Sequence, residues 1–327
     1  MLHKDHTFSE WPNNFKCSPY LQEKIVYVGQ LETYEQSSEL LKRLANVEVS
    51  DSSIFRMVNY YGRKIESTLY GAAPDKPESQ LAADEVIYIQ LDGSMIYTDD
   101  DWQEVKVGRI FKQSDCRESK VENRGNQIVK SEYAAYLGHY SNFVARFENL
   151  IEPYKRTNHQ LVFISDGASW IKNWLKDNYA DYPQILDIYH VCEHISRFAK
   201  EVFPRQYLKW FHTQKQLLLE AKPEQVIEQI KQLKLPDKQQ QIQRSKLLKY
   251  LQGNLNRIQY AQFRKKGWYI GSGAIEAAHR TVVQKRMKLS GQRWSNQGAA
   301  HLLNLRVCYM SHKWDLVLNN ILNKKTA

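Results

Sequence analysis

The change in hydrophobic period after residue 84 constrains the fold more than any other feature of this 327-residue chain. Before it the apolar residues have helical spacing, whereas the runs 85–96 and 104–112 have the period of strands and are expected to pair antiparallel. Helices expected at 140–154 and from about Ser169 then alternate with strand-like runs at 160–167 and 184–190. A meander followed by alternating helices and strands predicts an α/β protein with a mixed sheet and flanking helices.

Strand character is absent from the Lys- and Gln-rich stretch 191–265, which predicts an all-helical insertion. The sheet domain is therefore expected in two pieces, 84–190 and 266–315, followed by a C-terminal tail at 316–327. A linker that contains Pro and Ala, 72–83, separates this domain from the N-terminal residues.

Residues 1–71 are expected to form an N-terminal helical region. Helical spacing at 34–45, a short connection and a second helix capped by Ser50 or Asp51 resemble a helix-turn-helix, which reads DNA. An ordinary helical hairpin has the same spacing, and a carboxylate at the start of a recognition helix would repel phosphate. The apolar face of the second helix is predicted to contain Ile54, Met57 and Val58.

The net charge of +10 is unevenly distributed along the chain. Residues 191–327 contain 25 Lys and Arg against 8 Asp and Glu, whereas residues 1–190 contain 21 against 28. A basic half of this size favours a polyanionic partner, and nucleic acid is the commonest one in a cell. A solvated basic surface is the alternative.

The apolar and cysteine patterns argue against two classes of protein. The longest apolar runs have the length of strands, so none predicts a membrane span, and the first residues lack the apolar core of a signal peptide. The four cysteines are far apart and form no CxxC pair. This favours a reducing cytoplasm and disfavours a disulfide framework or a zinc ribbon.

Two carboxylates follow apolar runs and precede a glycine, namely Asp92 and Asp166. Either Asp-Gly pair alone is explained by a turn. Adjacent buried strands would instead bring both carboxylates to one spot, where they repel each other unless a cation lies between them. Mg²⁺ takes oxygen ligands of this kind, and two such ions can activate the attacking oxygen and stabilise the leaving oxygen of a phosphodiester.

A third carboxylate, Glu276, follows Gly271 and Gly273 in the segment "GSGAIEAAHR". Glycine lets a helix approach the sheet closely, so this acid is expected to complete the metal site. Taken alone, a carboxylate in a first helical turn is explained by the helix dipole.

The chain resembles bacterial insertion-sequence transposases of the DDE class, closest to the ISKra group, in four segments: "LDGS…EVKVGRIF", "FISDGASWI", "ILDIYHVCEHI" and "GSGAIEAAHRTVVQKRMKLSGQRWS". The resemblance extends from about residue 85 to 315, and more loosely over the N-terminal helices. It implies a ribonuclease-H-like catalytic core in which Asp92, Asp166 and Glu276 bind two Mg²⁺ or Mn²⁺ ions. The spacings of 74 and 110 residues between successive acids fit, because the longer one holds the helical insertion.

Related transposases with such an insertion carry a Cys/Asp-x-x-His motif after the second acid, and "DIYH" matches it with Asp187 and His190. Because they lie at the end of the strand that follows the helix after Asp166, we expect these two residues to act beside the metal site and not as metal ligands. His190 and His194 also have the i, i+4 spacing of zinc ligands, but Val191 stands where the metalloprotease motif needs Glu. Cys192 and His194 are otherwise expected to be packed residues.

A basic stretch after Glu276 is expected to bind the phosphates of DNA, with a tryptophan that stacks on an unpaired base. A solvated helix face with a packed tryptophan is the alternative. The residues predicted to bind DNA are Arg280, Lys285, Arg286, Lys288, Arg293 and Trp294.

The resemblance implies a transposase that cuts and joins double-stranded DNA at the ends of its own mobile element. We expect it to act as a homodimer or higher oligomer on DNA, in the cytoplasm and on the nucleoid. One alternative is a ribonuclease-H-like nuclease or resolvase without strand transfer. The other is a transposase-derived DNA-binding protein that has lost its chemistry, which the intact set of three acids disfavours.

Overall fold

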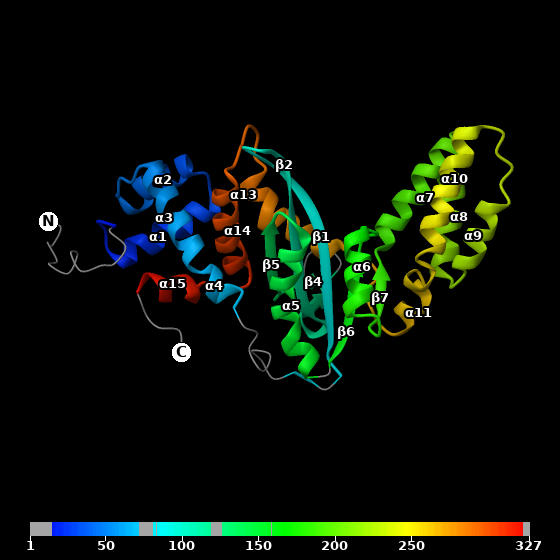
Figure 1. The fold of residues 1–327 in the computed structure, drawn as a ribbon, viewed down its shortest axis with the longest axis horizontal. Helices are drawn as coiled ribbons and strands as arrows, with labels where there is room; N and C mark the ends of the chain where they lie inside the picture. The colour runs from blue at the N-terminus through cyan, green and yellow to red at the C-terminus, as the bar shows by residue number, and fades with distance from the viewer. Residues whose placement is uncertain (1–14, 72–80, 83, 119–125, 158, 323–327) are drawn as a thin grey trace.

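The computed structural model describes residues 15–71, 81–82, 84–118, 126–157 and 159–322. Three parts lie side by side along its long axis: helices from both ends of the chain, a central β-sheet, and a bundle of helices (Figure 1). The N-terminal part consists of α1 (Pro19–Leu31), α2 (Tyr34–Ala45), α3 (Asp51–Lys64) and α4 (Glu66–Leu69).

The central sheet has five strands in the order β5-β2-β1-β6-β7. β2 pairs antiparallel with β1 and β5, whereas β6 runs parallel to β1, and β7 parallel to β6. The predicted antiparallel pair and the mixed sheet are therefore confirmed. The strands are β1 (Val86–Thr98), β2 (Asp101–Lys112), β5 (Glu132–Leu137), β6 (Gln160–Ser165) and β7 (Gln184–Leu186).

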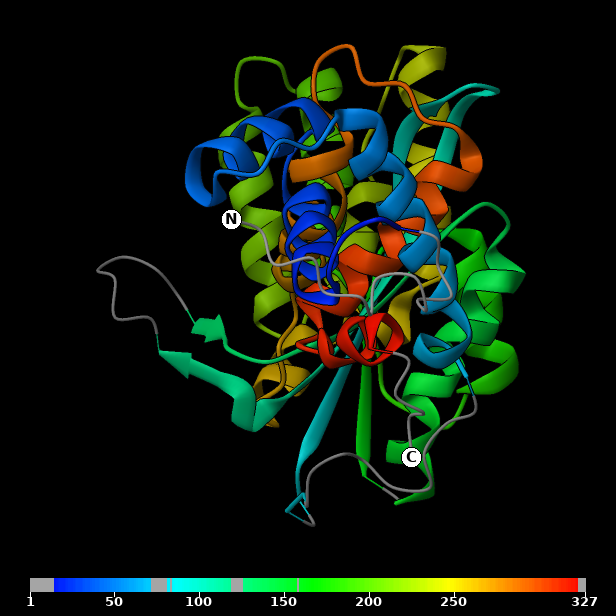
Figure 2. The ribbon, with the colours of Figure 1, turned by 90° about the vertical axis from the view of Figure 1, so that its left-hand side faces the viewer.

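Two features near the sheet have no counterpart in the sequence prediction. The edge strand β5 is only six residues long. A small hairpin of β3 (Cys116–Glu118) and β4 (Asn126–Ile128) projects from the side of the sheet (Figure 2). The three-residue strands of this hairpin carry too few alternating residues to be recognised from their period.

β1 continues well past Asp92, so the interpretation of Asp92 and Gly93 as a turn is wrong. Each residue from Asp92 to Thr98 has a partner on β2, which keeps the backbone extended. The parallel partner β6 stops earlier, at the pair of Leu91 and Ser165. β1 is therefore paired on both sides up to Leu91 and only on one side beyond it.

One face of the sheet is covered by α5 (Tyr140–Arg156) and α6 (Ser169–Asn178). Successive side chains of a strand point to opposite faces, and on β1 the residues Ile87, Ile89 and Leu91 point to this one. All three are fully buried. Both helices lie where the sequence predicts them, and α6 starts at the predicted residue.

The strand predicted at 184–190 is too long. β7 ends just before Asp187, which instead caps α7 (Ile188–Val202) by accepting hydrogen bonds from the backbone N–H groups of Tyr189 and His190. A side chain that satisfies the free N–H groups of a first turn starts a helix. Asp187 and His190 therefore lie at a helix start, and the helical part of the chain begins three residues earlier than predicted.

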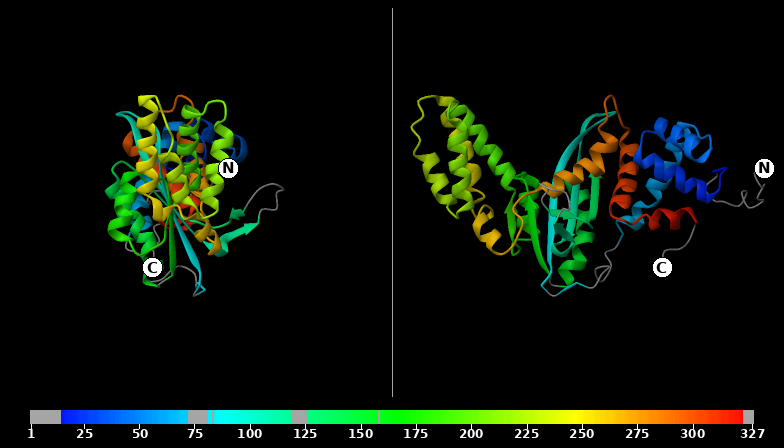
Figure 3. Two further views of the ribbon diagram at one scale, coloured as in Figure 1. Left: turned by 90° about the vertical axis from the view of Figure 1, so that its right-hand side faces the viewer. Right: turned by 180° about the vertical axis from the view of Figure 1, so that it is seen from behind.

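The stretch 191–265, which the structure describes completely, contains helices and connections and no strand, as predicted. The right-hand view of Figure 3 shows this bundle leaning away from the sheet. Its apolar residues form a core with one face of β6 and β7. Beside α7 it consists of α8 (Tyr207–Leu219), α9 (Pro223–Lys231), α10 (Lys238–Gln252), the turn η3 (Leu255–Arg257) and α11 (Tyr260–Lys265).

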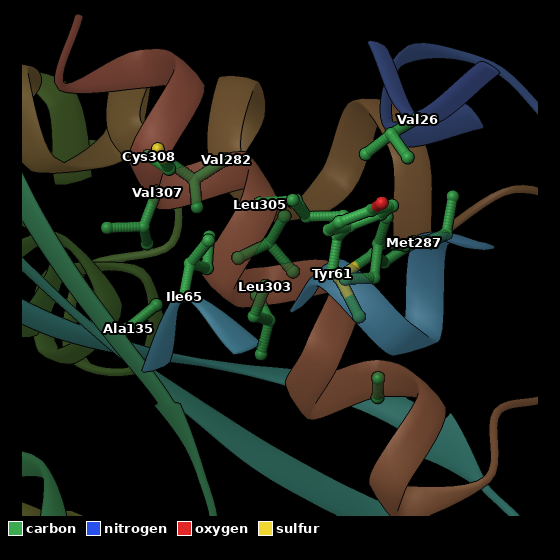
Figure 4. Packing of buried hydrophobic residues seen from close by; sticks show 14 of the residues in the cluster. Val26, Tyr61, Ile65, Ala135, Val282, Met287, Leu303, Leu305, Val307 and Cys308 are labelled. Atoms are coloured by element: carbon green, nitrogen blue, oxygen red, sulfur yellow. The ribbon is translucent and has the colours of Figure 1, made fainter. Parts of the chain in front are cut away.

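After the insertion the chain returns to the sheet as helices. They are α12 (Gly273–Ala278), the π-helical turn η4 (His279–Gln284), α13 (Lys285–Met287), α14 (Asn296–Met310) and α15 (Asp315–Ile321). α14 packs between β5 and α3, so that Tyr61 of α3, Ala135 of β5 and Leu305 of α14 belong to one cluster (Figure 4). The N-terminal helices, one part of the sheet and the C-terminal helices thus share a single hydrophobic core.

The N-terminal predictions that the structure tests are confirmed. Ser50 caps α3 by accepting the N–H of Ser53, and Ile54, Met57 and Val58 are buried in the shared core. The apolar face of this helix is therefore used for folding.

The predicted C-terminal tail begins with α15, whose Val317 and Ile321 are buried. Most of the predicted linker 72–83, the first 14 residues and the last five lie outside the described residues. Among the helices that the structure describes, none is both long and apolar enough to cross a membrane.

Candidate active site

The parallel register of β1 and β6 brings Asp92 and Asp166 to the same edge. The two strands pair as far as Leu91 and Ser165, and the two acids are the next residues of each chain. From there β1 continues along β2, while the chain after β6 turns into α6. The two acids predicted from separate apolar runs are therefore neighbours.

The carboxyl group of Asp92 is mostly buried, with 22% of the side chain exposed. Its Oδ1 accepts a hydrogen bond of 2.7 Å from the N–H of Gly93. Burial raises the pKa of Asp92 to about 6, and the negative charges of Asp166 and Glu276 add to this effect, which outweighs the lowering by the hydrogen bond. The charged form of this carboxylate is disfavoured until a cation approaches it.

Asp166 lies in the loop between β6 and α6, where its Oδ1 accepts a hydrogen bond of 3.0 Å from the N–H of Ala168. The strand end next to it is held by the buried Arg257, which comes from the end of the helical insertion. This guanidinium donates to Ser165 Oγ at 2.9 Å and to Asn254 Oδ1 at 3.1 Å. The insertion thus anchors the strand that carries the second acid.

Glu276 lies in the first turn of α12 with an exposed side chain, and its negative charge acts on Asp92. The segment before it is fixed at Ser272, whose N–H and hydroxyl donate to the two carboxylate oxygens of Asp187 at 2.9 and 2.8 Å. A Cβ at Gly271 would lie 2.7 Å from the ring of Tyr189, so a glycine is needed for this close approach.

Asp187 is fully buried and also holds His190, whose Nδ1 lies 2.7 Å from Asp187 Oδ2. The hydrogen bond to Asp187 raises the pKa of His190 to about 9, and the charge of Asp166 contributes, against the lowering effect of burial. Burial would raise the pKa of Asp187, but hydrogen bonds from His190 and Ser272 outweigh it and lower that pKa. At neutral pH the pair is an imidazolium and a carboxylate beside the acidic cluster.

The pKa of His190 predicts how the free energy of unfolding depends on pH. Because the pKa of about 9 in the folded state lies above the ordinary value of 6.5, the charged pair stabilises the protein fully below pH 6.5. This contribution is lost as the pH rises through 9. Denaturant unfolding in EDTA should show a decline from pH 6.5 to 9 that is smaller in His190→Ala. Identical profiles for the two proteins would contradict the ion pair.

His279 is a residue of the site that the sequence prediction missed. It is buried, its Nε2 lies 3.5 Å from Asp92 Oδ2, and neither ring nitrogen forms a hydrogen bond with a described residue. Burial lowers the pKa of His279 to about 4, so the ring is neutral at pH 7. It begins the π-helical turn after α12, a type of turn that is frequent at functional sites. Nothing in the sequence distinguishes it from an ordinary packed histidine.

The described residues contain no group of three or more His, Cys, Asp or Glu side chains that is already arranged to hold a metal ion. The donors that Asp92, Asp166 and Glu276 offer are all carboxylate oxygens, which suit Mg²⁺ or Mn²⁺. A divalent cation would also relieve the repulsion that contributes to the raised pKa of Asp92. In chemistry and charge, the three acids fit the predicted ion.

The structure gives no support to a zinc site at His190 and His194. His190 directs Nδ1 at Asp187, and the ring of His194 stacks on that of Tyr250 with 4.2 Å between their centres. Cys192 is not a nucleophile at neutral pH, because burial raises the pKa of its thiol to about 11.

Two of the residues predicted to bind DNA are buried, which corrects that prediction. Arg286 donates to the carbonyl oxygen of Gly29 and lies over the rings of Tyr34 and Trp294. Trp294 donates its indole N–H to the carbonyl oxygen of Met287 at 3.1 Å. Arg286 thus holds the C-terminal helices against the N-terminal ones, and Trp294 packs against Arg286 in the shared core. The residues of the basic stretch that stay exposed are Arg280, Lys285, Lys288 and Arg293.

The four exposed cations of this stretch are predicted to contribute affinity for DNA that falls with salt, because each neutralised phosphate releases counterions. Replacing Arg280, Lys285, Lys288 and Arg293 by Gln should reduce the slope of log affinity against log salt concentration by about 3 to 4. Fluorescence anisotropy with duplex DNA measures the slope. An unchanged slope would mean that this face is only solvated.

A scan against protein-family models finds no match to this chain, and a search of curated proteins finds no similar sequence.

Proposed function

We propose that this protein is a metal-dependent transposase of the DDE type, which cuts and joins double-stranded DNA at the ends of its own mobile element. The observation that carries the proposal is the register of β1 and β6, which sets Asp92 and Asp166 side by side. The negative charge of Glu276 also acts on Asp92, since it contributes to the raised pKa of that carboxyl group. Neighbouring carboxylates next to a basic stretch of the chain suit phosphodiester chemistry.

Asp92, Asp166 and Glu276 would hold Mg²⁺ or Mn²⁺, which when bound supplies activation of the attacking oxygen and stabilisation of the leaving oxygen. The chain's own residues prepare this site. Asp92 releases its proton near pH 6 and is thus available to a cation at neutral pH. The imidazolium of His190, oriented by Asp187, can donate a hydrogen bond to a phosphate oxygen beside the acids.

The wider fold also supports the proposal. The five-stranded mixed sheet with flanking helices agrees with the ribonuclease-H-like core that the sequence resemblance implies. The basic half of the chain and the exposed cations after Glu276 favour DNA as the partner. In this proposal the protein works as a homodimer or higher oligomer on DNA, in the cytoplasm and on the nucleoid.

The test uses a plasmid that carries the two DNA regions flanking the coding sequence, incubated with the purified protein and Mg²⁺. A transposase should release the segment between these ends and join it to a second plasmid. Cleavage without joining would instead identify a nuclease or resolvase. Binding of the flanking DNA without cleavage would identify a DNA-binding protein that lacks the chemistry.

A further inference from the structure

A cavity of about 500 Å³ lies beside the acidic cluster, and the function proposed above does not use it. Its walls come from β1, β2, the β3–β4 hairpin, α7, α8 and the start of α12 with the segment before it. They are mainly apolar, with Phe111, Ile188 and Ile270 among them. One polar side chain of β1 also lines it, Gln90, which points to the same face of the strand as Asp92, two residues further on. The cavity and Asp92 therefore lie on the same face of the sheet.

Gln90 has an unused hydrogen-bond acceptor at this cavity. The side chain is 1% exposed, and its Nε2 donates to the carbonyl oxygen of Gly271 at 3.4 Å. Its Oε1 is buried and accepts no hydrogen bond from any residue that the structure describes. A buried oxygen without a donor is costly, so a ligand that brings an N–H group into the cavity would be favoured.

A second cavity of about 510 Å³ adjoins the first one, because Tyr189, Cys192 and Lys215 line both. It adds two cations from α7, Arg197 and Lys200, against a single acid, Glu193. The residue Tyr189 is 58% exposed where the two cavities meet. Together they form a groove that is apolar at one end and positively charged at the other.

We propose that this groove binds single-stranded DNA, with one unpaired base in the apolar cavity and the backbone phosphates along Lys215, Arg197 and Lys200. Every DNA base has an N–H group that can donate to Gln90 Oε1, and every base has a flat face that can stack on the exposed ring of Tyr189. The groove therefore binds an unpaired base whichever of the four bases it is. The inference rests on the proposed function for its choice of DNA as the polyanion.

Gly273 offers a way to block the cavity without disturbing the fold. It lines the cavity, and a Cβ added there would meet no atom within 4 Å, so this glycine is not required for close packing. Gly273→Leu should fill the cavity, whereas Gly273→Ala is the matched control that leaves it open. Thermal unfolding checks that both variants fold as the parent does.

The binding measurement uses fluorescence anisotropy of a labelled oligonucleotide of about 12 nucleotides in EDTA, so that no cleavage occurs. Gly273→Leu should bind at least about 10-fold more weakly than Gly273→Ala, in keeping with the loss of one stacked base. The parent protein should bind an oligonucleotide of abasic sites more weakly than the normal oligonucleotide, by the same factor. Gly273→Leu should bind both oligonucleotides with equal affinity, because its cavity is already filled. Equal affinities of the two Gly273 variants would overturn the proposal.

The charged end of the groove is tested separately. The triple variant Arg197→Gln, Lys200→Gln, Lys215→Gln should lose at least about 10-fold in affinity for the same oligonucleotide at physiological salt. The control changes Lys209 and Lys231 to Gln, two exposed lysines of the insertion that line neither cavity. A loss of the same size in the control would show that only net charge matters, and would contradict the groove.

These results are independent of whether the protein is a transposase. If the element ends are cut and joined but the Gly273 and triple variants bind as their controls do, the groove is wrong and the function stands. If the variants bind as expected but no cleavage is found with Mg²⁺, the groove stands and the function is wrong.

Discussion

Replacing Asp92 by Asn should reduce Mg²⁺-dependent cleavage of element-end DNA by at least about 1,000-fold, because a metal ligand at the reacting phosphate is lost. Asp166→Asn and Glu276→Gln should have effects of the same order. The double variant of Asp92 and Asp166 should be no worse than either single one, since the acids act as one unit. Asp177→Asn, a change of an exposed carboxylate on α6, is the control and should cleave at the rate of the parent.

Stability separates this explanation from simple misfolding. The pKa of about 6 means that the charge of Asp92 destabilises the folded protein at neutral pH. This destabilisation is absent below pH 3.8, grows as the pH rises, and is complete once the pH exceeds 6. Asp92→Asn should therefore raise the free energy of unfolding at pH 7, by up to about 3 kcal/mol. Mg²⁺ should raise the Tm of the parent more than that of the variant. An Asp92→Asn variant that is inactive and less stable than the parent would contradict the metal-site assignment.

The second large effect concerns a buried cation that joins the two ends of the chain. Arg306 of α14 donates to the carbonyl oxygens of Thr281 and Val282 in η4, and to the backbone and side-chain oxygens of Gln30 in α1. Burial lowers its pKa to about 10, so it remains charged at neutral pH. Arg306→Ala leaves these oxygens without a donor and should lower the free energy of unfolding by about 3 to 5 kcal/mol.

Denaturant unfolding measures this loss, and Arg264→Ala is its control, because Arg264 is exposed on α11. The control should change the free energy of unfolding by less than about 0.5 kcal/mol. Hydrogen exchange should also become faster in α1 and η4 of Arg306→Ala than in the helical insertion. A loss below about 1 kcal/mol would mean that water replaces the guanidinium at these carbonyl groups.

The contacts of Arg306 also make the N-terminal helices an integral part of the fold. Gln30 lies in α1, and Thr281 and Val282 follow Glu276 within two turns of the chain. One side chain thus connects α1 to η4, the turn that directly follows the helix with the third acid. No spacing in the sequence indicates this link, because its partners are more than 250 residues apart.

The sequence by itself determined the larger elements and their order. The antiparallel pair, the helices α5 and α6, and the all-helical insertion follow from hydrophobic period over long segments, which local side-chain geometry dictates. The cap of α3 at Ser50 follows in the same way, because its hydrogen bond spans only three residues. The three acids were likewise selected from their positions after apolar runs and glycines, and their role as metal ligands stays a prediction.

Only the tertiary structure decided which side chains are available at the site. Arg286 and Trp294 have the sequence pattern of DNA-binding residues but are buried, because Arg286 bonds to Gly29 of α1 and its guanidinium lies over the ring of Trp294 in the shared core. His279 lies beside Asp92, and Gln90 donates to Gly271, through contacts that cross from one segment to another. Burial and pairing between distant segments depend on the whole core, and a local pattern of residues does not specify them.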